Sequence, residues 1–95
     1  MPVKISESET DIRKTLVSYM RVKGWFVYHN LAGLGCYPGL SDLVAVKDGL
    51  VIHIEIKKVG GKQSEKQKQF QVDLESHGGR YLIARSIEDL EKAGM

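Results

Sequence analysis

The sequence predicts an α/β domain in which a mixed β-sheet is flanked by helices, with the element order α-β-β-β-α-β-α. Two β-prone runs flank the dipeptide Asp48-Gly49, which is among the strongest signals for a two-residue hairpin turn. Amphipathic helical segments lie on both sides of this hairpin. A further β-prone run follows the second helix and can join the sheet through a crossover connection. We therefore expect one domain over residues 1–95.

The first segment, residues 6–23, is predicted to be a helix that ends at Gly24. Its apolar residues recur at helical spacing, and they are Ile12, Leu16, Tyr19 and Met20. The run Ser6-Glu7-Ser8-Glu9 matches a capping box, with Ser6 at the N-cap and Glu9 at N3.

The same stripe, extended toward the N-terminus, places Glu9 on the side that faces the sheet. Glu7 and Asp11 then point elsewhere. Glu9 is therefore either a capping residue or a third acid of a metal site, and the two roles are compatible.

The remaining elements follow from composition and turn signals. Residues 25–30 form a β-prone run, and residues 31–40 a glycine-rich loop that either passes close to a DNA backbone or only connects two strands. Ser64 is expected to cap a helix over residues 64–77, which ends at Gly78-Gly79. Residues 80–85 are a predicted strand. A short terminal helix then begins at Ser86, with Asp89 at N3.

The hairpin brings acidic residues together. If Asp48 and Gly49 are the loop residues, the numbers of paired residues sum to 97 and Asp42 lies opposite Glu55. Lys57 shares that face, because strand residues two apart point to the same side. Carboxylates directly opposite each other destabilise a sheet, and both faces of the hairpin are mostly apolar, so these charges are costly unless they are paired or bind metal.

This arrangement predicts a site for a hard divalent cation, Mg²⁺ or Mn²⁺. Mg²⁺ is usually held by one or two carboxylates, with phosphate and water at its other positions. Lys57 can then orient an attacking water or stabilise charge on a phosphate. The alternative is that Asp42 only begins a strand and that Glu55 and Lys57 are edge-strand charges that promote solubility.

One polar residue lies on the inward stripe of the second helix. Phe70 and Leu74 define that stripe, and Gln67 extends it toward the helix start. Gln67 either satisfies a buried backbone group or hydrogen-bonds a nucleophilic water or the scissile phosphate.

Basic residues gather between positions 57 and 68, where five lysines accompany a single acid, Glu65. They are candidates for DNA phosphate contacts or belong to a solvated segment; beyond Lys57 they are Lys58, Lys62, Lys66 and Lys68. Asn30 is a weaker candidate for a substrate contact. His29 and His53 lack a partner at ligand spacing and are interpreted as surface or packed residues.

Composition narrows the class of protein. Hydrophobic residues make up 42% and charged residues 27% of the chain, an ordinary globular mixture. The single cysteine, Cys36, excludes an intramolecular disulfide and a cysteine-based zinc site. No signal-peptide pattern and no apolar run long enough for a membrane span is seen, so we expect a soluble, cytoplasmic protein that does not bind membranes.

Taken in order, these motifs resemble the PD-(D/E)xK nuclease superfamily and, more narrowly, the VRR-NUC domain. The superfamily pattern is matched by Glu9, Gly39-Leu40-Ser41-Asp42 and Glu55-Ile56-Lys57, with Ser41 in place of the usual proline. The narrower resemblance rests on Gly-x-Ser-Asp-Leu, Ser64-x-x-Gln67, Gly78-Gly79-Arg80-Tyr81 and Ala84-Arg85-Ser86-x-Glu88-Asp89-Leu90.

This resemblance implies a restriction-endonuclease-like core and Mg²⁺- or Mn²⁺-dependent DNA cleavage. It implies that Asp42, Glu55 and the backbone carbonyl of Ile56 bind metal, that Lys57 activates or positions water, that Gln67 contacts water or phosphate, and that Glu9 completes the acidic set. Stand-alone members of this size look like phage or bacterial proteins, so the compartment is the cytoplasm of a bacterium or a phage-infected cell. Homodimers that cut branched DNA such as Holliday junctions occur among them.

The leading hypothesis is therefore a dimeric, metal-dependent endonuclease that acts on branched DNA and needs no further small-molecule cofactor. A catalytically silent DNA-binding module with the same fold is the first alternative. A restriction-type nuclease that cuts linear duplex is the second.

Overall fold

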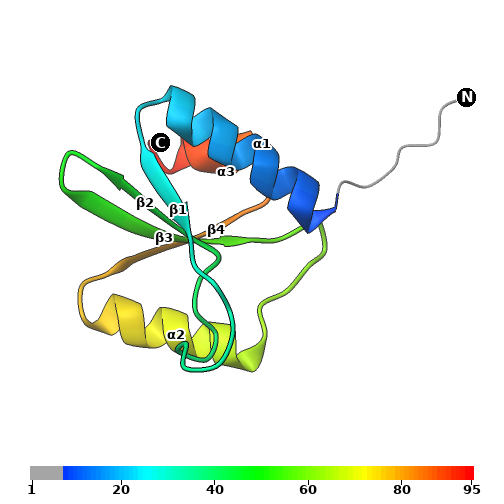
Figure 1. The fold of residues 1–95 in the computed structure, drawn as a ribbon, viewed down its shortest axis with the longest axis vertical. Coiled ribbons are helices and arrows are strands. Elements are labelled where there is room, and N and C mark those ends of the chain that lie inside the picture. The colour runs from blue at the N-terminus through cyan, green and yellow to red at the C-terminus, as the bar shows by residue number, and fades with distance from the viewer. Residues whose placement is uncertain (1–7) are drawn as a thin grey trace, which may run out of the picture.

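The computed structural model describes residues 8–95. Its elements are α1 (Glu9–Val22), β1 (Phe26–His29), β2 (Leu43–Lys47), β3 (Leu50–Ile56), α2 (Glu65–Ser76), β4 (Arg80–Ala84) and α3 (Ile87–Lys92) (Figure 1). This is the predicted order of helices and strands. None of the described helices has the length and apolar character needed to cross a membrane.

The four strands form one mixed sheet in the order β1-β2-β3-β4. The first two pairings are antiparallel, and β3 pairs with β4 in parallel. Lys47 lies opposite Leu50 and Leu43 opposite Ile54, which confirms the predicted register. Asp48 and Gly49 both have positive φ, 51° and 80°, as a two-residue turn of this kind requires.

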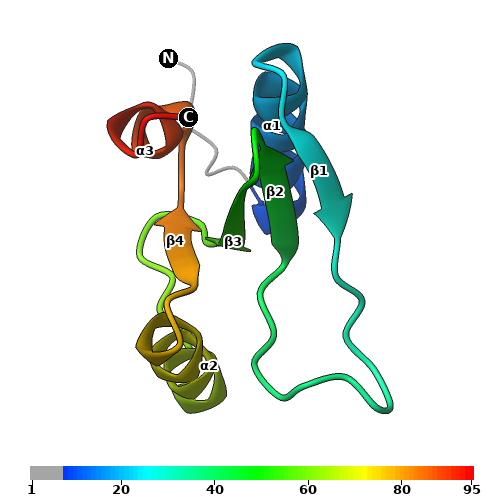
Figure 2. The same ribbon diagram turned by 90° about the vertical axis from the view of Figure 1, so that its left-hand side faces the viewer.

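Helices cover both faces of the sheet. In Figures 1 and 2, α1 and α3 lie on one face and α2 lies on the other. The main core is on the α1 side, and its fully buried members are Leu16, Met20, Leu43, Ala45, Ile54, Ile56, Ala84 and Leu90. On the α2 side, Phe70 packs against His53 and Tyr81, with ring centroids 5.5 and 6.1 Å apart.

The first helix begins later than the sequence predicted. Ser8 is the N-cap, and its hydroxyl accepts a hydrogen bond from the backbone N–H of Asp11 at 3.1 Å. Glu9 is therefore the first helical residue and not the N3 residue of a Ser6 capping box, so that prediction was wrong. The sequence holds two serines that suit an N-cap, and each has an acid three residues later. Ser6 and Glu7 lie outside the described residues.

The long loop between β1 and β2 packs on α2 at Gly39. This glycine has a φ of 79°, and a Cβ there would lie 2.2 Å from the carbonyl oxygen of Lys66. The loop backbone thus touches the backbone of the first turn of α2, an approach that only glycine allows. The backbone that passes close to the glycine-rich loop at this position is that of α2. This contact holds the chain in place just before Asp42.

Both later helices begin as predicted. Ser64 and Gln67 form a reciprocal capping box at the start of α2. Ser86 caps α3 by accepting from the backbone N–H of Asp89.

Candidate active site

Two acidic side chains meet at the end of the β2–β3 hairpin that lies far from its turn. Asp42 directly precedes β2, and its Oδ2 accepts a hydrogen bond from the backbone N–H of Ile56 at 2.8 Å. Glu55, in β3, is only 1% exposed, and the carboxyl group of Asp42 is near enough to raise its pKa. The structure therefore brings together the two carboxylates that the register predicted.

The carboxyl group of Glu55 is held by neutral donors. Gln67 Nε2 donates to Glu55 Oε1 at 3.1 Å, and the Tyr81 hydroxyl donates to Oε2 at 3.3 Å. The Tyr81 oxygen in turn accepts from Gln63 Nε2 at 3.1 Å. Each carboxylate oxygen has a second lone-pair site, so these contacts fix the group and leave it able to bind a further partner.

Burial dominates the acidity of Glu55. Desolvation raises its pKa to about 8, the neighbouring carboxyl of Asp42 adds to the rise, and Lys57 and Tyr81 oppose it. Ionising this group therefore costs free energy unless a cation lies beside it.

A hard divalent cation fits this donor set. The two carboxyl groups are adjacent, one buried and one 28% exposed at its side chain, and Mg²⁺ needs only one or two carboxylates when phosphate and water supply its other ligands. Within residues 8–95 no group of three His, Cys, Asp or Glu side chains is placed to hold a metal. Glu9 is thus not clustered with Asp42 and Glu55, and its role as a third acid stays a prediction.

The side chain from α1 that lies beside Asp42 is the guanidinium of Arg13, and not the carboxylate of Glu9. Arg13 Nη2 lies 3.8 Å from Asp42 Oδ1, and both side chains are about 70% buried, with 29% and 28% exposed. Arg13 is one helical turn beyond Glu9, so it occupies the same row of the helix.

Lys57 follows β3 directly, and its backbone N–H donates to the carbonyl of Ala84 at 3.2 Å. Its charge lowers the pKa of Glu55 and so favours the ionised form of the buried carboxyl. Ile56 has its N–H bonded to Asp42. The role of its carbonyl as a metal ligand stays a prediction.

Gln67 makes two hydrogen bonds in the structure, one to a backbone group and one to a side chain of the site. Its Oε1 accepts from the backbone N–H of Ser64 at 2.9 Å, which completes the capping box, while its Nε2 holds Glu55. A contact of Gln67 with water or phosphate stays a prediction.

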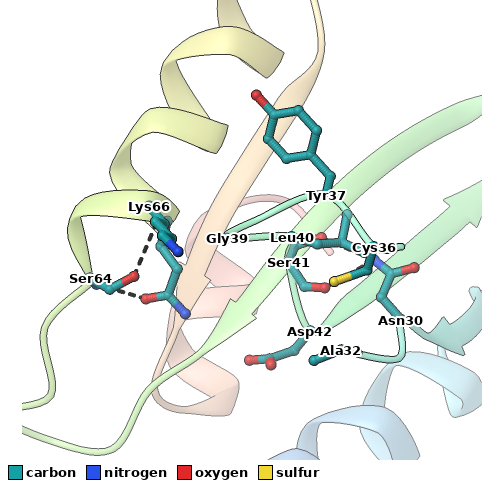
Figure 3. A pocket seen from close by; sticks show the side chains of 11 residues that line it. Asn30, Ala32, Cys36, Tyr37, Gly39, Leu40, Ser41, Asp42, Ser64 and Lys66 are labelled. Atoms are coloured by element: carbon teal, nitrogen blue, oxygen red, sulfur yellow. Dashed lines mark hydrogen bonds between the residues drawn. The ribbon is translucent and has the colours of Figure 1, made fainter. Parts of the chain in front are cut away.

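A pocket of about 290 Å³ opens beside Asp42, between the β1–β2 loop and the start of α2. In Figure 3, Asp42 lies across the pocket from Ser64 and Lys66. Asn30 lines the same pocket, but its Nδ2 donates to the carbonyl oxygen and the hydroxyl of Ser41, at 3.0 and 3.3 Å. The amide of Asn30 therefore supports the segment that leads into Asp42.

The predicted lysines are all on the surface. Lys58, Lys62, Lys66 and Lys68 are exposed, and Lys68 forms an exposed ion pair with Glu65 at 3.3 Å. His53 is half-buried, and its Nδ1 lies 2.8 Å from the Ser41 hydroxyl, so the interpretation of a packed histidine is confirmed. His29 is exposed.

The sequence reasoning missed three residues of this site: Tyr81, Gln63 and Arg13. Tyr81 lies opposite His53 in the parallel β3–β4 pairing, a register that no turn dipeptide encodes. Arg13 was detectable only through its spacing of four from Glu9.

Comparison with known proteins gives a fold assignment. No protein-family model matches the sequence, and no curated protein matches it either. Solved structures do match, and two of them are described as follows. One, described as "VRR_NUC domain", has a TM-score of 0.77 and 20% identity and covers 88% of this chain and 90% of its own. The other, "VRR_NUC domain protein", also has a TM-score of 0.77, with 17% identity, and covers 94% of this chain and 86% of its own. The chain therefore has the fold of a VRR_NUC domain, as its motifs predicted.

Proposed function

We propose that this protein is a divalent-metal-dependent endodeoxyribonuclease that hydrolyses phosphodiester bonds in branched DNA. The observation that carries the proposal is the placement of Asp42 beside Glu55, where Asp42 accepts from the backbone N–H of Ile56 and raises the pKa of Glu55. One of these carboxyl groups is almost fully buried, has a pKa raised to about 8 and is hydrogen-bonded by neutral donors. Such a pair is poorly explained as surface charge, because a buried carboxyl lowers stability unless it gains a partner.

Each residue of the site has a defined part in this proposal. Asp42 and Glu55 hold the cation, Mg²⁺ or Mn²⁺, with the Ile56 carbonyl as a further ligand. A bound divalent cation supplies Lewis-acid polarisation of a phosphoryl oxygen and a lower pKa for a bound water. Gln67 fixes the orientation of Glu55. Lys57, next to Glu55, stabilises negative charge on the phosphate or orients the attacking water.

The surface around the site suits a polyanion. Three exposed lysines lie between β3 and the first turn of α2 without a carboxylate partner within 4.0 Å among the described residues, and they are Lys58, Lys62 and Lys66. Lys66 also lines the pocket beside Asp42. Binding should therefore weaken steeply as salt is added.

A homodimer is part of the proposal, because two sites related by a two-fold axis suit a branched substrate that needs paired nicks. An apolar area supports it. Phe26 and Tyr28, on the edge strand β1, are 66% and 43% exposed, and their rings lie 5.6 Å apart. Exposed apolar groups on an edge strand are typical of an association surface. The preference for branched DNA rests on the resemblance to dimeric stand-alone nucleases.

Two observations favour a catalytically silent DNA-binding module as a second candidate. Asp42 is already paired with Arg13, and the described residues bring no third acid into the site. Such a protein would bind DNA without a divalent metal.

The test is cleavage of labelled four-way junction, flap and linear duplex in Mg²⁺ and in Mn²⁺. The wild type is compared with Lys57→Ala and with Lys92→Ala, a control on the exposed end of α3. Cleavage of branched DNA by the wild type and the control, but not by Lys57→Ala, would support the proposal. Equal cleavage of linear duplex at fixed sequences would favour the restriction-type reading, and binding without cleavage would favour the silent module.

A further inference from the structure

A second depression lies on the α1 side of the sheet, and one of its lining residues, Arg13, pairs with Asp42 of the site. It has a volume of about 570 Å³, and it extends along one side of α1 as far as the last residue of β1. It is lined by Thr10, Arg13, Lys14, Val17, Ser18, Arg21 and His29. These seven residues form the α1 groove. From Thr10 to Arg21 the helix rises by roughly 16 Å, a length that spans several phosphates of a nucleic-acid strand.

The α1 groove is basic. Its lining contains three permanent cations and no acid. Within the described residues no carboxylate lies within 4.0 Å of Lys14 or Arg21, since Arg13 and Lys68 are the cations for which an ion pair is found. Arg21 is nevertheless held in place, because one of its Nη atoms donates to the carbonyl of Val27 at 3.2 Å. The hydroxyls of Thr10 and Ser18 add neutral donors of the kind that bind phosphate oxygens.

The groove is continuous with the acidic pair through one contact. Arg13 lines the groove, and its guanidinium lies 3.8 Å from Asp42 Oδ1. Asp42 also lines the pocket on the α2 side. Asp42 thus lies between two depressions: it lines the one that Lys66 borders, and it is joined to the α1 groove by its ion pair with Arg13.

We propose that the α1 groove binds the phosphate backbone of the DNA segment that extends from the Asp42–Glu55 site over α1. The inference rests on the proposed function, because it takes DNA as the substrate. It adds a second binding surface, on the opposite sheet face from the lysines that precede α2. The ligand class follows from the charge, the hydroxyl donors and the continuity with Asp42.

The test measures binding without cleavage. Affinity for a labelled four-way junction is measured by fluorescence anisotropy in EDTA, between 50 and 200 mM salt, for the wild type and for Lys14→Gln/Arg21→Gln. The matched control, Arg80→Gln/Lys92→Gln, also removes one arginine and one lysine, at the start of β4 and at the end of α3. Unfolding midpoints of all three proteins are compared first.

Log affinity falls as log salt rises, and each phosphate contact adds roughly one to the steepness of that fall. We therefore expect the slope of the groove variant to be shallower than that of the wild type by about two. Its affinity should fall roughly tenfold or more, while the control stays within about twofold of the wild type. A second measurement needs no variant: acetylation of Lys14 in the wild type should be slowed by bound DNA, and that of Lys92 should not.

An unchanged salt slope in the groove variant, together with unprotected Lys14, would overturn the inference, as would a wild type that does not bind DNA. Cleavage in Mg²⁺ and Mn²⁺ is assayed separately. Protection of Lys14 without cleavage would refute the nuclease and leave the groove assignment standing. Cleavage by the wild type, together with normal DNA binding by the groove variant, would support the nuclease and refute the groove assignment.

Discussion

Gln67 Nε2 donates a hydrogen bond to Glu55 Oε1 at 3.1 Å, while Oε1 of the same amide accepts from the backbone N–H of Ser64 at 2.9 Å. One side chain thus begins a helix and orients the buried carboxyl. The position of α2 and the geometry of the acidic pair are coupled through this amide. A change in one is expected to disturb the other.

Replacing this amide should reduce both stability and activity. Gln67→Ala removes a capping contact and leaves Glu55 with one donor fewer, so we expect a loss of about 1–2 kcal/mol in the free energy of unfolding. DNA cleavage should fall as well, because Glu55 loses a residue that orients it. Urea denaturation and the cleavage assay measure the two effects.

Gln69→Ala is the matched control for Gln67→Ala. Gln69 lies on the same helix, and within residues 8–95 its side chain bonds only to Asp73, at 3.0 Å on the surface, so its removal should change stability by less than about 0.5 kcal/mol. Equal effects of the two substitutions would contradict a special role for Gln67.

The Tyr81 hydroxyl should matter for metal binding. Tyr81→Phe removes the donor to Glu55 Oε2 and the acceptor of Gln63. Loss of an outer contact of a metal ligand typically weakens metal binding by about 10–100-fold, so we expect Mn²⁺ affinity, measured by calorimetry, to fall by about tenfold. Stability should fall by about 1 kcal/mol.

Tyr19→Phe separates the metal effect from a general loss of stability. The Tyr19 hydroxyl donates to the carbonyl of Met95 at 3.1 Å, on the α1 side of the sheet. Its removal should lower stability by a comparable amount and leave Mn²⁺ affinity unchanged. A fall in affinity in both variants would argue against the positioning role of Tyr81.

The raised pKa of Glu55 predicts a pH dependence of the metal-free protein. The folded protein keeps this carboxyl protonated up to a pKa of about 8, whereas the ordinary pKa of an exposed glutamate is 4.5. The native state therefore binds the proton more tightly, and stability falls as pH rises through this window. The shift corresponds to roughly 4–5 kcal/mol between pH 4.5 and pH 8.

The measurement is the unfolding free energy of the wild type minus that of Glu55→Gln, in EDTA, from pH 5 to pH 8. The difference removes His53, whose pKa is lowered by burial and which therefore changes stability in the opposite direction. A difference that does not change with pH would contradict the assignment. Added Mn²⁺ should flatten the wild-type curve, because a bound cation favours the ionised carboxyl.

Local signals explain what the sequence predicted. Asp48-Gly49 determined the hairpin register, and the register placed Asp42 against Glu55. The start of α2 is marked by two residues that lie three apart in the sequence, Ser64 and Gln67. In each case the residues that interact are close in the chain or are tied by a turn of known geometry.

Non-local contacts explain what it missed. Tyr81 contacts Glu55 because β4 pairs in parallel with β3. A whole helix separates these two strands along the chain, so no turn sets their register. Arg13 reaches Asp42 only because α1 packs across the sheet. The start of α1 was misjudged because Ser6 and Ser8 are equally good caps by composition, so the local sequence does not choose between them.

The contact of Gly39 with α2 predicts a large effect of a small substitution. Gly39→Ala puts a Cβ 2.2 Å from the Lys66 carbonyl oxygen and 2.7 Å from the Gln67 nitrogen, at a φ of 79°. Both obstacles are backbone, so the loop must move away from α2. We expect a loss of about 3 kcal/mol or more, beyond the roughly 1–2 kcal/mol for a left-handed alanine alone, and weaker DNA cleavage because Asp42 moves with the loop.

Gly35→Ala is the matched control, since Gly35 has a similar φ of 89° and a Cβ there meets no atom within 4 Å. It carries the conformational cost without the collision, so it should lose about 1–2 kcal/mol in urea denaturation. Its cleavage activity should stay near the wild-type level. If the two variants were equally stable, the contact between Gly39 and the first turn of α2 would not be what holds Asp42 in place.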